Sequence, residues 1–144
     1  MKHFTFDEAN KALVLVKPIV SDIRKKWEVV KKLKDECDAI VLNHLEGEEI
    51  LDQKEEELDV LLEEIEGHIK ELHDVGCEFK GFEEGLVDFP AKLETRTIHL
   101  CWKYGEEKIE HWHEIFEGLP GRKSLNAELI EEIKKITSTY SATR

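Results

Sequence analysis

The chain has 144 residues, of which 40% are hydrophobic and 38% are charged, and its formal net charge is -12. This length is typical of one domain, and the apolar fraction is enough for a modest core. The strong acidity argues against nucleic acid as a partner, because phosphate binding needs a clustered basic surface.

The cysteines and the apolar segments indicate the compartment. Cys37, Cys77 and Cys101 lie far apart and lack Cys-x-x-Cys spacing, so we expect neither a disulfide framework nor a zinc knuckle. No uncharged stretch reaches the ~18 residues that could span a bilayer, and the N-terminus lacks the pattern of a signal peptide. We therefore expect a cytoplasmic protein without a membrane segment.

The first predicted helix has a clear start. Thr5 and Glu8 have the spacing of a capping box, in which each side chain bonds the backbone amide of the other, so a helix should begin near Phe6. Apolar residues then recur three and four positions apart as far as Ile40, which is typical of an amphipathic helix. Pro18 interrupts this pattern and predicts a kink or a short break.

The second predicted helix runs from about Glu48 to Val75, with Gly76 as its C′ residue. Its outer surface is strongly acidic, whereas the middle of the first helix is rich in lysine. The two helices should therefore form an antiparallel hairpin over 6–75, in which the opposite charges offset each other.

Beyond the hairpin the side-chain period changes to that of strands. Val87 to Phe89, ended by Pro90, and Thr97 to Trp102 predict two short strands joined by a turn over 92–96. Because strand side chains alternate, Ile98, Leu100 and Trp102 should share one face while His99 and Cys101 share the other.

The rest of the chain completes an α+β fold. Ile109 to Ile115 predicts a fourth strand, with His111 and His113 on one face, and 77–79 is a candidate further strand. Asn126 can cap a last helix over 126–137. The sequence thus predicts a single domain over 1–144 with three parts: a long antiparallel helical hairpin (6–75), a small antiparallel β-meander with its loop (77–122), and a C-terminal helix.

One candidate site combines Asp88, Glu106, His113 and Arg122. A carboxylate beside a histidine can orient the imidazole, and an arginine can clamp a carboxylate or phosphate at two points. This set favours a small anionic ligand. The alternative is an internal salt bridge between Asp88 and Arg122 that ties the meander to the last loop.

A metal site and a nucleophile are two further candidates. His111 and His113 could hold a divalent transition metal, with Cys101, Asp88 or Glu114 completing the ligand set, although strands also carry such histidine pairs without a metal. Cys101 could act as a nucleophile with His113 as its base, although a strand cysteine is more often a small core residue.

The length of the hairpin indicates self-association. Helices of about 26 residues extend ~39 Å, further than a meander of short strands can cover. A homodimer in which two hairpins form a four-helix bundle would cover the exposed apolar stripe. In the alternative monomer, the last helix and the start of the first fill the gap.

Four sequence blocks carry a resemblance to a known family. FTFDEAN, GLVDFPA, LCWKYGEEKIEHWHE and GLPGRKSL occur in this order and span nearly the whole chain. In these blocks the chain resembles an uncharacterised prokaryotic family, domain of unknown function 2203. The resemblance implies no activity, substrate or cofactor, and a pattern that is looser at His99 and His111. It implies that the family pattern includes Asp88, Cys101, Trp102, Gly105, Glu106, Trp112, His113, Gly121 and Arg122.

Two classes of function follow from these candidates. The leading hypothesis is a non-enzymatic cytoplasmic module that binds a small ligand or a protein partner at the polar site of the meander. The rival is a metal-dependent or Cys/His hydrolase that uses His113 with Cys101, His111 and Asp88.

Overall fold

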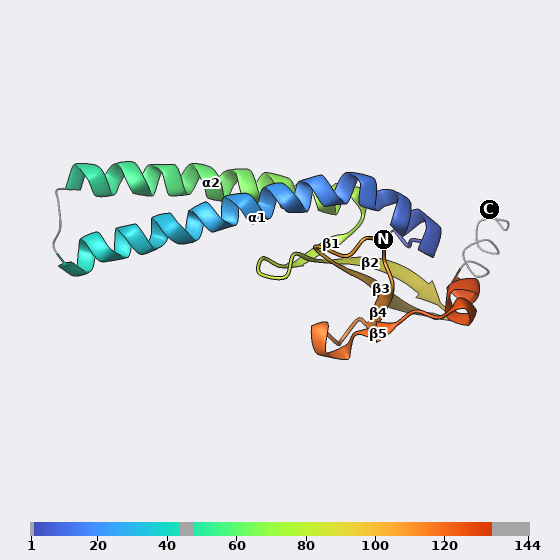
Figure 1. Ribbon diagram of the computed structural model, residues 1–144. Coiled ribbons are helices and arrows are strands. Elements are labelled where there is room, and N and C mark those ends of the chain that lie inside the picture. The colour runs from blue at the N-terminus through green and yellow to red at the C-terminus, as the bar shows by residue number, and fades with distance from the viewer. Residues whose placement is uncertain (1, 44–47, 134–144) are drawn as a thin grey trace.

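The computed structural model describes residues 2–43 and 48–133. Two long antiparallel helices pack on one face of a five-stranded antiparallel sheet whose strands follow in chain order (Figure 1). The predicted α+β fold with a helical hairpin, a meander and a C-terminal helix is therefore confirmed. The elements are α1 (Phe6–Asn43), α2 (Glu48–Val75), β1 (Glu78–Gly81), β2 (Leu86–Leu93), β3 (Arg96–Lys103), β4 (His111–Glu114), η1 (Leu119–Gly121) and β5 (Lys123–Ser124), and a helix over 127–133 ends the described part.

The start of α1 is the predicted capping box. The Thr5 amide donates to Glu8 Oε1 at 3.0 Å, and the Glu8 amide donates to Thr5 Oγ1 at 3.1 Å. The helix then continues through Pro18, so of the two predicted outcomes, a kink or a short break, the break does not occur. Val16 and Val20 are completely buried on either side of Pro18, and burying both on the same helical stripe outweighs the loss of one backbone hydrogen bond.

The end of α2 is also as predicted. Gly76 has a φ of 109°, and its amide donates to the His73 carbonyl at 3.0 Å. The Cys77 amide donates to the Leu72 carbonyl at 3.2 Å, which completes a Schellman motif. This positive φ favours glycine and turns the chain from α2 into β1.

Strand β2 passes through Pro90 and ends at Leu93, so the predicted end at Pro90 is wrong. Pro90 pairs with His99 of β3, but on its other side it lies beyond the last β1 pair, Glu78 with Asp88. There the Pro90 carbonyl accepts a hydrogen bond of 2.7 Å from the Phe4 amide. The missing N–H of proline therefore costs no ladder bond, because β1 has already ended.

The core lies between the sheet and the hairpin. Ile98, Leu100 and Trp102 face the helices, as their alternation predicts, and join a cluster of buried residues from β2, α1 and α2. The buried Ile133 adds the last helix to the same cluster. The Asn126 side chain caps this helix by accepting from the Leu129 amide at 2.8 Å, and the predicted residues 134–137 lie outside the described part.

The last strands differ in extent from the prediction. β4 covers only His111–Glu114, because the Ile109 amide donates to Asn10 Oδ1 of α1 at 2.8 Å and is not available to the sheet. β5 was not predicted, since two residues are too short to show an alternating pattern. The candidate strand at 77–79 is β1, which begins at Glu78.

The hairpin extends well beyond the sheet. Figure 1 shows the sheet beneath only the end where α1 begins and α2 ends. Charged pairs join the helices, for example Lys26 with Glu64 at 2.8 Å and Lys54 with Glu36 at 2.6 Å. Among the described residues, no helix is long and apolar enough to cross a membrane.

Candidate metal centre

The face of the sheet opposite the helices carries a group of buried polar side chains. Asp88 of β2 pairs with Cys101 of β3, and His99 of β3 pairs with His113 of β4. Alternation along each strand places these residues on the face away from Trp102 and the core. We call Asp88, His99, Cys101 and His113 the outer-face cluster; their exposed fractions are 1%, 7%, 0% and 2%.

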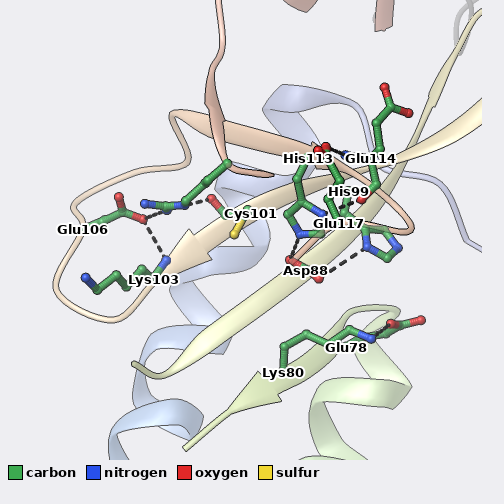
Figure 2. A network of polar contacts seen from close by, with 11 residues as sticks. Glu78, Lys80, Asp88, His99, Cys101, Lys103, Glu106, His113, Glu114 and Glu117 are labelled. Atoms are coloured by element: carbon green, nitrogen blue, oxygen red, sulfur yellow. Dashed lines mark hydrogen bonds and ion pairs between the residues drawn. The ribbon is translucent and has the colours of Figure 1, made fainter. Parts of the chain in front are cut away.

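Asp88 lies between the two imidazoles. Its Oδ1 is 2.9 Å from His113 Nε2, and its Oδ2 is 3.3 Å from His99 Nδ1, as the dashed lines in Figure 2 show. Burial alone would raise the pKa of Asp88, but the interactions with His99 and His113 outweigh it and lower the pKa below its ordinary value. The carboxylate is therefore ionised although it has almost no contact with water.

The other ring nitrogen of His113 determines its tautomer. Nδ1 is 2.7 Å from the Glu114 carbonyl oxygen, which can only accept, so Nδ1 carries a proton and donates it. In a neutral imidazole, Nε2 then presents a lone pair to the Asp88 carboxylate. Two acceptors at 2.9 Å repel each other unless a positive centre, a proton or a metal ion, lies between them.

Cys101 contributes a sulfur atom to the same space. Its Sγ, a carboxylate oxygen of Asp88 and a ring nitrogen of His113 all lie within 4.8 Å of one another. Burial, with the nearby Asp88 charge, raises the pKa of Cys101 to about 11. The side chain is therefore a neutral thiol, and both nitrogens of the candidate base His113 already have other partners. This arrangement is poor for a nucleophile.

His111 and Glu114 lie apart from these ligand atoms. His111 Nδ1 is 3.4 Å from Glu106 Oε2, although His111 and His113 share a face as predicted. The Glu114 carboxylate binds Arg96, with both hydrogen bonds at 3.0 Å, and its backbone carbonyl accepts from His113. The predicted pair of metal-ligating histidines is thus divided between two groups of residues.

A second polar group consists of Glu106 and Arg122, which form an ion pair. Arg122 also donates to the Cys101 carbonyl at 3.2 Å, and Glu106 accepts from the Lys103 amide at 2.7 Å. Burial alone would raise the pKa of Glu106, but Arg122 and the amide lower it. Within the described residues, Arg122 therefore pairs with Glu106 and not with Asp88, and the predicted four-residue site separates into two neighbouring pairs.

His99 is the residue to which the sequence reasoning assigned no role. Alternation already placed it on the face of Cys101, which is confirmed. Its proximity to Asp88 depends on the pairing of β2 with β3, where the two residues are diagonal neighbours. Only the register, which is not visible in the sequence, brings them together.

The fold and the cluster define a class: an α+β protein with a helical hairpin on one face of its sheet and a buried set of carboxylate, thiol and imidazole groups on the other. A family model described as "Uncharacterized conserved protein (DUF2203)" matches residues 2–125. The chain therefore belongs to the DUF2203 family, as its sequence blocks indicate. No curated protein and no solved structure matches it.

Proposed function

We propose that this protein is a non-enzymatic metal-binding module that holds a divalent transition metal of the zinc class between Asp88, Cys101 and His113. The main support is the geometry of His113, whose Nδ1 is held by the Glu114 carbonyl while Nε2 faces Asp88. Metal-ligating histidines commonly donate their second N–H to such a carbonyl, which fixes the tautomer that a metal needs.

The chemistry of the donor atoms supports the same class of ion. A thiolate, an imidazole and a carboxylate are ligands that zinc accepts, whereas magnesium and calcium prefer oxygen alone. A bound cation would deprotonate the Cys101 thiol. Arg122 lies beside Cys101 and already opposes, in part, the upward shift of its pKa.

A proton between Asp88 and His113 is the competing explanation and would make a buried ion pair. It accounts for those two residues but assigns no role to the Cys101 sulfur in the same 4.8 Å space. A metal ion uses all three groups. The anionic ligand of the first hypothesis is less well supported, because Glu106 already pairs with Arg122.

Metal analysis tests the proposal directly. The full chain, purified without a histidine tag and dialysed against zinc, should retain one equivalent of zinc, and His113→Ala and Cys101→Ser should lose it. His73→Ala is the matched control, because His73 is an exposed histidine at the end of α2. If the parent chain neither retains zinc nor competes for it with a chelating dye, the proposal is wrong.

The state of the three cysteines supports a cellular compartment for the protein. Cys37, Cys77 and Cys101 are all free and buried. Free thiols, and a thiolate ligand in particular, persist best in a reducing environment. We therefore include the cytoplasm in the proposal; export of the protein with its cysteines paired would contradict it.

A second candidate function, self-association, is supported by the part of the hairpin beyond the sheet. Large apolar side chains are exposed there on both helices, and they are Val29, Val41, Leu42, Ile50, Val60 and Leu62. A second copy could cover them by placing its lysine-rich α1 beside the acidic α2 of the first. Light scattering should give the mass of a dimer for the parent chain and a lower mass for a Val60→Lys variant. A single-chain mass for the parent would rule out self-association.

A further inference from the structure

Arg24 of α1 is a half-buried cation without an acidic partner. The other arginines of the described chain are both paired, Arg96 with Glu114 and Arg122 with Glu106. Arg24 has no carboxylate within ion-pair distance among the described residues, although the chain has 33 acidic residues. A charge that is partly removed from water and has no counterion calls for a physical explanation.

Neutral groups hold the Arg24 side chain in place. Its Nη2 donates to the Glu83 carbonyl at 3.4 Å, and its guanidinium lies over the Tyr104 ring, 4.5 Å from the centroid. Gly85, with a φ of 61°, permits this packing, because a Cβ there would lie 2.6 Å from Tyr104 Cβ and 3.0 Å from Arg24 Cδ. These contacts fix the guanidinium but leave its charge without a counterion.

A surface hollow of about 270 Å³ lies beside this guanidinium. It is lined by Ser21, Arg24, Lys25, Glu28 and Tyr104. Glu28 is the only acidic residue of the lining, and Lys31 pairs with its carboxylate at 2.9 Å. Lys31 also pairs with the neighbouring Glu83, at 3.2 Å. The hollow therefore presents two cations that no acid of the described chain pairs with, together with a hydroxyl group and an aromatic ring.

We infer that this hollow binds the phosphate group of a small phosphorylated molecule, with Arg24 and Lys25 contacting the phosphate oxygens. A guanidinium binds phosphate at two points, and a phosphate monoester, with a charge of about -1.5 to -2, balances both cations, whereas a carboxylate balances one. The volume is below the roughly 300–1,000 Å³ of pockets for drug-sized ligands, which favours a small metabolite over a nucleotide. The hollow lies on α1, and the outer-face cluster lies on the sheet face away from the helices, so this inference does not depend on the metal site.

A purely structural role for Arg24 is the competing explanation. In that case Arg24 only ties the turn between β1 and β2 to α1, through the Glu83 carbonyl and the Tyr104 ring. This role accounts for the position of the guanidinium but needs neither Lys25 nor the hollow. The two explanations differ in one measurable respect, because a structural arginine gives the chain no affinity for phosphate.

The experiment titrates the full chain with inorganic phosphate, glycerol phosphate or acetate at constant ionic strength and follows the amide NMR signals. Both phosphates should shift the signals of residues 21–28, and acetate should not. Arg24→Gln and Lys25→Gln should each weaken phosphate binding at least about 10-fold, because a hydrogen bond to a charged group contributes that much. Lys34→Gln is the matched control, since it removes the same charge from an exposed position of the same helix, and its affinity should equal that of the wild type.

Several results would overturn the inference. Absence of shifts with phosphate, or equal affinities of Lys25→Gln and Lys34→Gln, leaves Arg24 with a structural role only. Acetate that binds as tightly as phosphate contradicts the choice of phosphate, and weaker binding of glycerol phosphate than of inorganic phosphate contradicts a phosphorylated molecule as the ligand. The Lys25 side chain has no contact that holds the fold, so Lys25→Gln decides the question even where Arg24→Gln fails to fold.

Discussion

Two polar groups share one face of the sheet, and their environments differ. In the outer-face cluster, a carboxylate faces two imidazoles and a thiol with almost no exposure to solvent. In the Glu106–Arg122 pair, opposite charges meet directly, and both side chains are partly exposed. The pair satisfies its own charges, whereas the cluster needs an additional positive centre. A proton or the proposed metal ion supplies this centre in the cluster, whereas the pair needs neither.

The largest expected effect comes from Asp88→Ala, which removes the residue that contacts both imidazoles. The free energy of unfolding should fall by about 3–5 kcal/mol, the usual result of removing one partner of a buried charged pair. Urea titration measures the change. Glu78→Ala is the control, because Glu78 pairs with Asp88 across the strands but is only half-buried. Comparable losses for both variants would contradict the contrast between buried and exposed groups.

Zinc should stabilise the folded chain through the outer-face cluster alone. Free zinc at 100 times its dissociation constant should raise the free energy of unfolding by about 2.7 kcal/mol. Thermal unfolding with and without zinc, after removal of metal by a chelator, measures this gain. The same gain in His113→Ala would show that the ion binds elsewhere.

Arg122→Ala tests the second polar group. It removes the ion pair with Glu106 and the hydrogen bond to the Cys101 carbonyl, so stability should fall by about 1.5 kcal/mol, as for hydrogen bonds to charged groups. The zinc content should remain one equivalent, because Arg122 contributes no ligand atom. Loss of zinc without a loss of stability would contradict this prediction, because it would show that Arg122 belongs to the metal site.

The smallest effect is expected for His111→Ala. The contact of His111 with Glu106 is long and partly exposed, so stability should change by less than about 1 kcal/mol. Denaturant midpoints of His111→Ala and His99→Ala, recorded with zinc present, give the comparison. A larger loss for His111→Ala than for His99→Ala would contradict the contrast between the buried and the partly exposed histidine.

The sequence predicted the helices accurately because their signals are local. Thr5 and Glu8 form the start of α1, and Gly76 ends α2, through contacts within a few residues. The faces of β3 were also predictable from alternation. The prediction that β2 ends at Pro90 failed because the effect of a proline depends on where the neighbouring strand β1 ends. The local sequence around Pro90 does not indicate that length.

The candidate site was predictable in part. The sequence predicts Asp88, Cys101 and His113 as candidate site residues, and the structure brings their ligand atoms together. The partner of Arg122 and the partners of His99 and His111 were not predictable. A shift of one residue in the pairing of β3 with β4 would turn both His111 and His113 to the opposite face, and a shift of two would exchange their places.

The sequence alone determined the class of the fold, the ends of the helices and the kinds of donor atom available on the sheet, because period, caps and residue chemistry act over short distances. Tertiary structure decided which of these donors meet. The register of β2, β3 and β4 is set by packing against the hairpin, and this register places both His99 and His113 beside Asp88 while His111 lies beside Glu106.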